Sequence, residues 1–235
     1  MGFGPRLRAL DALPATGLPD ELERGLRALP EADLATRALE ACTLFNAKER
    51  LMLTGSTGNG GTLAATAAWM KWLDPVKCEA AESMMRVDTR MNLADDLLLY
   101  GYKTSMAASL EARVPMLDIE LMKFVESLPL NYRMALGRGK IVHKRMAENY
   151  LPSAIVNRPK RGFHVPFGDW SRGPWRDYIE DALFAPDGPH LDYLDKGALS
   201  TLWQDHVSQR RDRSRQIFAL LMLALWWRHA LHGTA

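Results

Sequence analysis

At 235 residues, the chain is long enough for one large domain or two modest ones, each with its own core. Its 30 basic and 28 acidic side chains leave a net charge of +2, which excludes binding to nucleic acid or membranes through overall charge. The longest apolar run, residues 217–227, has 11 residues and is too short to span a bilayer, and the N-terminus lacks a signal-peptide core. The distant cysteines Cys42 and Cys78 indicate reduced packing residues in a cytoplasmic protein.

Helical spacing of apolar residues dominates the first half of the chain. Prolines and glycines near the start predict an irregular lead-in over residues 1–33, made of short helical pieces and turns, before a helical lobe over 34–235. The helices expected next begin near residue 32 and cover 47–53, 63–73 and 80–93. Within 93–111 the sequence predicts the start of one helix, a glycine at Gly101 and a second helix.

Helical patterns continue in the second half of the chain. They predict helices within 118–129, 139–152, 175–183, 197–209 and 217–227, the first with Asp118 as its N-cap. Residues 157–175 hold three prolines and three glycines, which predicts a shaped loop in place of a helix or strand. Because Val, Ile and Thr seldom cluster, strand signals are scarce, and the expected fold class is mainly α.

The segment GSTGNGGT at 55–62 resembles a phosphate-binding P-loop in spacing. Gly55, Gly60 and Thr62 occupy the required positions, but Gly61 stands where the P-loop lysine would neutralise phosphate charge. The alternative is a glycine-rich connection between helices. The missing lysine favours that alternative.

Glu111 and Arg113 form the first group with catalytic potential. They lie two residues apart before Val114 and Pro115, a dipeptide that favours extended backbone, so both side chains are expected on one face. A carboxylate beside a guanidinium can be a structural ion pair that fixes the turn. It can also be a carboxylate kept ionised for proton transfer or amine binding. Spacing alone favours the structural pair.

The second group is NRPKRGF at 157–163, which presents Arg158, Lys160 and Arg161 between Pro159 and Gly162. A lysine on a restricted loop suits a site where negative charge develops, as in phosphoryl or adenylyl transfer, whereas cations on a solvated loop serve no specific role.

Other patterns of reactive residues are weaker. The basic run at 209–216 has no interleaved aromatic residues and is interpreted as a solvated helix face. The histidines lack metal-ligand spacing, and no G-x-S-x-G elbow supports Ser-His-Asp catalysis.

Two long segments, LADDLLLYGYKTSMAASLEARVPMLD at 93–118 and AENYLPSAIVNRPKRGFHVPFGDW at 147–170, resemble the C-terminal half of the glutamine-hydrolysing asparagine synthetase family. The resemblance implies the helical C-terminal lobe of an adenine-nucleotide α-hydrolase-like (PP-loop) α/β synthetase domain, with the sheet largely absent. It also implies an ATP-dependent reaction in which aspartate is activated as β-aspartyl-AMP and ammonia from glutamine attacks the adenylate.

The resemblance also implies roles for individual residues. Glu111 matches the family glutamate near the intermediate, where it would accept a proton from ammonia. Lys160 resembles the lysine that steadies charge on the α-phosphate. Ser109 and Leu110 match the stretch that lines ATP. Positions corresponding to Arg113 and Asp118 hold this turn in place around the bound substrates.

Three departures from the family pattern limit what the resemblance implies. The pyrophosphate-binding SGGxDS loop is absent from the sequence, and Gly2 stands where the family has its N-terminal nucleophilic cysteine. Tyr102 replaces a common aspartate of the family motif. The chain is therefore expected to be a fragment or one half of a split enzyme, inactive alone, with the Mg ligands outside it.

The expected partners are small molecules, namely ATP, ammonia and aspartate, together with the synthetase and glutaminase portions. We expect no nucleic acid, membrane or bound metal ion. Two alternatives remain open: a non-catalytic interaction lobe, or a related enzyme acting on another acid, as in β-lactam synthetases and peptide cyclases.

Overall fold

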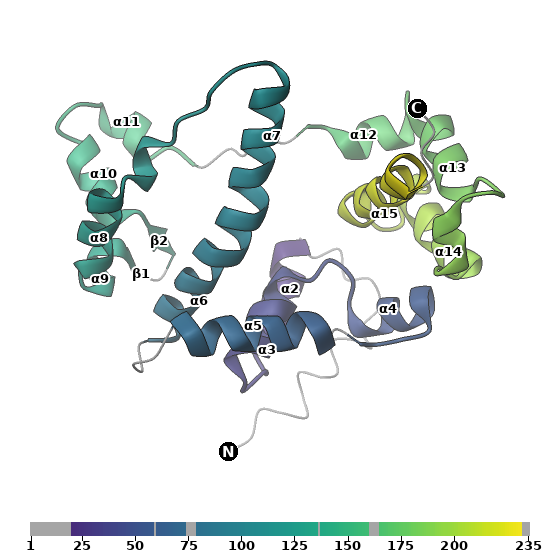
Figure 1. The fold of residues 1–235 in the computed structure, drawn as a ribbon, viewed down its shortest axis with the longest axis horizontal. Helices are drawn as coiled ribbons and strands as arrows, with labels where there is room; N and C mark the ends of the chain where they lie inside the picture. Colours follow the sequence, from purple (N-terminus) through teal and green to yellow (C-terminus); the bar gives the residue numbers. More distant parts are fainter. Residues whose placement is uncertain (1–19, 59, 74–78, 136, 160–164, 232–235) are drawn as a thin grey trace. The chain divides into compact units, whose positions relative to one another are not determined.

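A computed structural model describes residues 20–58, 60–73, 79–135, 137–159 and 165–231 (Figure 1). The chain divides into two compact units. Unit 1 comprises residues 1–68 and 164–235, and unit 2 comprises residues 69–163. Most of the described chain is helical, as the sequence predicts, and a small two-stranded sheet is present that the sequence did not predict. None of the helices in the described ranges is both long and apolar enough to cross a membrane.

The first helices of unit 1 follow the predicted order. They are α2 (Asp20–Ala28), α3 (Leu34–Cys42), α4 (Ala47–Thr54) and α5 (Gly60–Leu73), the last of which continues into unit 2. Helix α2 lies within the predicted lead-in and packs against α3. Residues 55–58 form the exposed connection between α4 and α5, with Gly55 in the left-handed conformation that ends α4. The connection expected for residues 55–62 is confirmed over 55–58, whereas Gly60, Gly61 and Thr62 lie in the first turn of α5.

The core of unit 1 is formed by its C-terminal elements. These are α12 (Phe167–Arg172), α13 (Arg176–Phe184), η4 (Pro189–Asp192), α14 (Lys196–Val207), α15 (Ser214–Trp226) and η5 (Trp227–Leu231). Ile179, Leu199, Trp203 and Ile217 are buried together, and Leu53 of α4 joins them from far away in sequence. The buried apolar side chains of α4, α13, α14 and α15 thereby cover one another.

Unit 2 contains one long helical rod, with its shorter elements on one side of it (Figure 1). The elements of unit 2 are α6 (Ala80–Asp88), η2 (Thr89–Leu98), α7 (Leu99–Ala107), η3 (Pro115–Leu117), α8 (Ile119–Ser127), α9 (Leu130–Arg133), β1 (Met134–Ala135), β2 (Arg138–Gly139), α10 (Ile141–Ala147) and α11 (Ser153–Val156). Strands β1 and β2 pair antiparallel, Met134 with Gly139 and Ala135 with Arg138. In Figure 1, the chain from α6 to α7 runs as a continuous rod.

The structure corrects four expectations. Gly101 does not separate two helices: it lies inside α7, because one glycine costs a helix only about 1 kcal/mol. Within the predicted loop 157–175, residues 167–172 form α12, whose Phe167 is buried in the core of unit 1. Cys42 is exposed, so its predicted packing role is wrong, and Cys78 lies outside the described residues. Arg213 is buried, whereas the basic run at 209–216 is expected to be solvated.

Candidate functional site

The end of α7 presents the segment that carries the proposed catalytic motif. Leu110 N–H donates to Ser105 O at 2.9 Å, and Ser109 N–H donates to Met106 O at 2.9 Å. This pair of bonds is the Schellman pattern that closes a helix, and it places Ser109 in the left-handed region with φ 56°. A residue with a Cβ is strained there, so the chain is redirected at Ser109 at a cost in free energy.

Glu111 and Arg113 follow this turn and point to the same side, as the spacing predicts. Arg113 Nη2 lies 3.1 Å from Glu111 Oε1. The side chain of Arg113 is 82% exposed, and that of Glu111 is 70% exposed. An ion pair in this much water contributes about 0–1 kcal/mol, too little to fix the turn by itself. Both charged groups are open to a ligand or to another protein surface.

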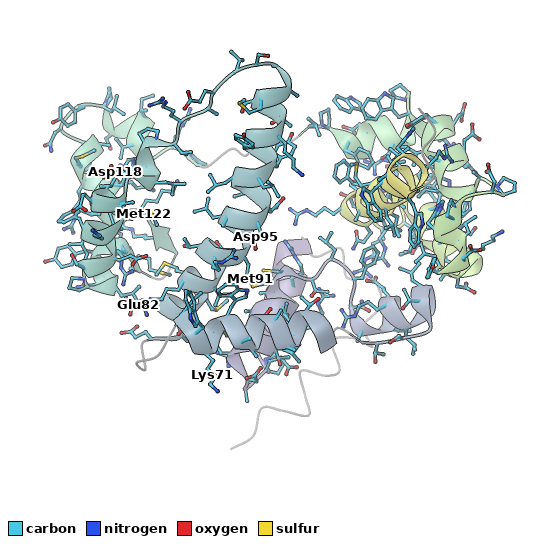
Figure 2. The ribbon with its side chains drawn as sticks, in the orientation of Figure 1. Lys71, Glu82, Met91, Asp95, Asp118 and Met122 are labelled. Carbon is cyan, nitrogen blue, oxygen red and sulfur yellow. The ribbon has the colours of Figure 1, made fainter. Side chains whose placement is uncertain are left out.

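Asp118 is the N-cap of α8, as predicted. Its Oδ1 accepts hydrogen bonds from the N–H groups of Glu120 and Leu121, both at 3.0 Å. Figure 2 shows Asp118 at the start of α8, with Met122 one turn further along. The cap fixes where the motif segment ends, because it satisfies two of the N–H groups that have no partner inside the helix.

The structure brings together only part of the predicted site. Ser109, Leu110, Glu111, Arg113 and Asp118 follow one another along the segment between α7 and α8. Lys160 lies outside the described residues, so its position relative to Glu111 stays a prediction. In the ranges that the structure describes, no group of three or more His, Cys, Asp or Glu side chains could hold a metal ion.

A buried polar cluster in unit 1 was not anticipated from the sequence. Arg213 Nη1 lies 2.5 Å from Glu49 Oε1, and both side chains are almost completely buried. The prediction that the 209–216 run is a solvated helix face is wrong at this residue. Asn46 and Glu49 form a capping box at the start of α4, a pattern the sequence could have revealed. The partner of Glu49 is 164 residues away, and no local pattern identifies it.

His206 links this cluster to α12. Its Nε2 lies 2.7 Å from Ser171 Oγ, while its Nδ1 lies 3.3 Å from the backbone nitrogen of Arg213 and 3.4 Å from Arg172 Nη1. Since both neighbours of Nδ1 are donors, Nδ1 accepts and Nε2 carries the hydrogen. The Ser171 hydroxyl then donates to Gly168 O at 3.1 Å.

Asp212 completes a Ser171–His206–Asp212 arrangement, with Oδ1 3.6 Å from His206 Nδ1. This arrangement does not suit nucleophilic catalysis. Nε2 already holds the proton that a base would have to accept from serine, and Ser171 has no exposed surface. Burial lowers the pKa of His206, and the charge of Arg172 lowers it further, against the opposing effect of Asp212. The cluster therefore has a structural role.

The motif and the helical fold agree with the comparisons to known proteins. Residues 6–228 match the family model described as asparagine synthase. The chain belongs to this family.

Similar proteins include glutamine-hydrolysing asparagine synthetase 1 of Bacillus subtilis, 29% identical over 143 residues, which are 61% of this chain and 22% of that protein. Proteins provisionally named glutamine-hydrolysing asparagine synthetases in Mycobacterium bovis and M. tuberculosis are 31% identical over 169 residues, or 72% of this chain. The matched segment covers 24% of their length. No solved structure gives a significant match.

Proposed function

We propose that this chain forms the helical lobe of an ATP-dependent, amide-forming synthetase with a PP-loop α/β domain. It acts with portions that supply the pyrophosphate loop, the Mg ligands and ammonia from glutamine. The proposed reaction, in the cytoplasm, activates aspartate as β-aspartyl-AMP and converts the adenylate to asparagine. The observation that carries the proposal is the motif segment 109–118, held between the end of α7 and the cap of α8 with Glu111 exposed.

Each predicted site residue has a role in this reaction. In the first step, aspartate oxygen attacks the α-phosphate of ATP, pyrophosphate leaves, and Lys160 balances the negative charge that grows on the phosphate. In the second step, ammonia forms the C–N bond, AMP leaves, and Glu111 accepts the proton that nitrogen loses. Arg113 forms an ion pair with Glu111 at the substrate site. Ser109 and Leu110 line ATP, and Asp118 holds the turn.

The exposed apolar side chains of unit 2 support the proposal that other portions of the synthetase pack against this chain. Leu110 and Val114 are both more than half exposed and lie within the motif segment. Apolar side chains grouped around a polar motif are typical of a surface that another protein part covers. On this view the isolated chain supplies one wall of the nucleotide site.

The first experiment measures binding of ATP and magnesium to the isolated chain by calorimetry. We expect weak binding at best, because the SGGxDS loop is absent from the sequence. Submicromolar affinity would instead mean that a complete nucleotide site exists in this chain.

The second experiment combines the chain with a synthetase portion that carries the SGGxDS loop and measures the two half-reactions separately. Lys160→Ala should reduce pyrophosphate release about a hundredfold or more, as expected when a preorganised charge is lost. Glu111→Gln should leave adenylate formation intact and abolish amide formation. The melting temperature should stay close to the parent value, because the Glu111–Arg113 pair is exposed.

Equal losses in both half-reactions, together with a lower melting temperature for Glu111→Gln, would show that Glu111 is a structural residue. An assembly that forms but makes no pyrophosphate, even with the parent sequence, would favour the non-catalytic interaction lobe. Replacing aspartate with other carboxylic acids in the same assay identifies the acid that is activated.

A further inference from the structure

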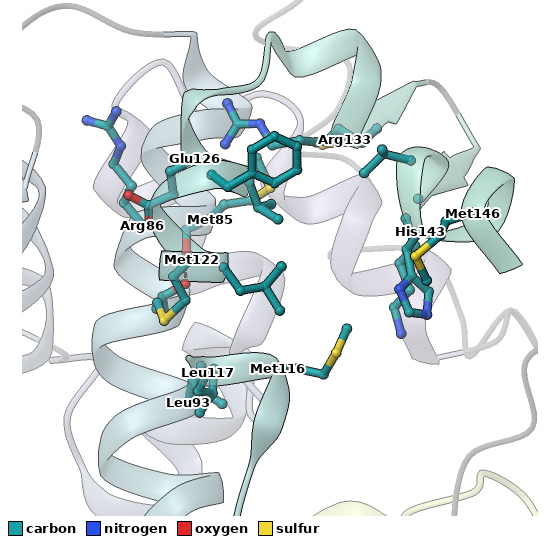
Figure 3. Close-up of a pocket in the computed structure, with 18 of the residues that line it drawn as sticks. Met85, Arg86, Leu93, Met116, Leu117, Met122, Glu126, Arg133, His143 and Met146 are labelled. Carbon is teal, nitrogen blue, oxygen red and sulfur yellow. Dashed lines mark hydrogen bonds between the residues drawn. The ribbon is translucent and has the colours of Figure 1, made fainter. Parts of the chain in front are cut away.

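Unit 2 contains a cavity of about 940 Å³ (Figure 3). The charged pair of the motif segment, Glu111 and Arg113, does not line this cavity. Its walls come from α6, η2, η3, α8, α9, the β1–β2 hairpin and α10. In Figure 3, Met85 and Met122 lie on one side of the cavity, and His143 and Met146 lie on the other. This volume falls within the roughly 300–1,000 Å³ typical of pockets for small organic ligands.

The lining is predominantly apolar and unusually rich in methionine. Five lining residues are methionines: Met85, Met116, Met122, Met134 and Met146. Unbranched thioether side chains adapt to the shape of a bound apolar group better than branched ones do. Such a lining suits a flexible aliphatic chain, and it offers few polar contacts to a nucleotide or an amino acid.

The charged residues of the lining are mostly cationic. Arg86, Arg133, Arg138 and Lys140 are present with one carboxylate, Glu126. Arg133 is paired with Glu82, so its charge is already balanced. The side chains of Arg138 and Lys140 are exposed and have neither an ion-pair nor a hydrogen-bond partner within the described ranges. Arg138 lies in β2 and Lys140 lies two residues further on, at the start of α10, where the two cations can bind an anion.

One wall of the cavity belongs to an unusual helical segment. Thr89 and Leu93 line the cavity from η2, where residues 89–98 are wound as a π-helix. π-Helical turns are rare and frequently occur at functional sites, because they shift side chains out of the α-helical register. The π-helical segment η2 is a second feature that marks this cavity as a binding site.

We propose that this cavity binds an amphiphilic carboxylic acid: its aliphatic chain lies among the methionines and its carboxylate lies at Arg138 and Lys140. The inference does not depend on the proposed synthetase reaction, since neither Glu111 nor Arg113 lines the cavity. A polar acid such as aspartate would leave the apolar walls without a partner. An amphiphile with a cationic head group would be repelled by the unpaired charges of Arg138 and Lys140.

The test is a titration of the full chain, carrying ¹³C-methyl methionine, with dodecanoate below its micelle concentration. The methyl signals of the five lining methionines should shift, whereas those of Met52 and Met222 in unit 1 should not. Dodecanol and dodecylammonium, with the same chain, separate the contribution of the carboxylate. Calorimetry should show dodecanoate binding roughly tenfold or more tightly than dodecylammonium.

Charge reversal at the rim provides the decisive variant. Arg138→Glu with Lys140→Glu should weaken dodecanoate binding roughly tenfold and reverse the preference between the two amphiphiles. Lys103→Glu with Arg145→Glu is the matched control: both residues are exposed in unit 2, neither lines the cavity, and the change in net charge is the same. Leu121→Trp, which fills the cavity and leaves the rim intact, should reduce binding of every chain-bearing probe.

Three results would overturn the inference. Dodecanoate could fail to bind, or it could shift Met52 and Met222 as strongly as the lining methionines, which indicates surface adsorption. The rim variant could also bind dodecanoate as tightly as its control. The circular dichroism of each variant, compared with the parent, establishes that the loss is not caused by unfolding.

Discussion

Arg213 and Glu49 form a buried ion pair, with Nη1 2.5 Å from Oε1, that joins the loop before α15 to the first turn of α4. Glu49 Oε2 also accepts the backbone N–H of Asn46 at 3.0 Å, and Gln216 Nε2 donates to Leu44 O at 3.1 Å. Several polar contacts therefore fasten the segment around α4 to α15 inside unit 1.

Removing one charge of this pair should be costly. Glu49→Gln keeps an acceptor for the capping box but leaves Arg213 buried without its counter-charge, so we expect a loss of about 3–5 kcal/mol in unfolding free energy. Urea denaturation measures this loss. The control is Glu120→Gln, which removes one partner of an exposed pair with Lys123 and should cost no more than about 1 kcal/mol. Similar losses in both variants would contradict the assigned burial.

Stability should fall as the pH is lowered through the range in which His206 titrates. The folded-state pKa of His206 is below its ordinary value of 6.5 because of burial and the charge of Arg172, with Asp212 opposing them. The unfolded chain therefore takes up a proton at higher pH than the folded chain. The contribution of neutral His206 to the free energy of unfolding is complete above pH 6.5. It decreases below pH 6.5 until the folded-state pKa is reached.

Melting temperatures measured from pH 8 down to the acid limit, together with two histidine variants, test this pH dependence. His206→Gln should flatten the decrease below pH 6.5, and His229→Gln, at an exposed histidine, should not. The pKa of Asp212 is also lowered from its ordinary value. Although burial acts to raise its pKa, hydrogen bonds from Ser214 and nearby positive charge hold it below 3.8. An unchanged slope in His206→Gln would assign the pH dependence to another group.

Ser109→Gly should stabilise the protein. Ser109 has φ 56° at the end of α7, a conformation that glycine adopts without the steric cost of a Cβ. We expect a gain of about 0.5–1 kcal/mol, since the greater freedom of glycine in the unfolded chain offsets part of the relief. Ser109→Val should lower stability. Chemical denaturation gives both values, and a loss for Ser109→Gly would mean that the serine hydroxyl makes a compensating contact.

Asp118→Ala should destabilise α8 by about 1 kcal/mol, because two backbone N–H groups lose the carboxylate that accepts them. Asp118→Asn should retain most of that stability, since an amide oxygen can still cap the helix. Thermal unfolding of both variants is the measurement. Equal losses for alanine and asparagine would indicate that the negative charge, and not the cap, is what matters.

Sequence patterns located most helices because the interactions that form them are local. The N-cap of α8 at Asp118, the end of α4 at Gly55 and the apolar α15 all depend on residues within a few positions of one another. The predicted break between helices at Gly101 is wrong. The helix continues on both sides of Gly101, and its interactions outweigh the small cost of one glycine.

The sequence by itself determined the family, the mainly helical character and the segment with Glu111 and Arg113. Motifs and helical spacing involve residues that are close together in the sequence, so they can be recognised without the structure. Only the tertiary structure decided which charges are buried. Arg213 sits in a basic run that resembles a solvated surface, yet it lies against Glu49 from 164 residues away. The cavity of unit 2 likewise depends on helices and a hairpin meeting in space. Burial is set by contacts between distant segments, and those contacts leave no periodic trace in the sequence.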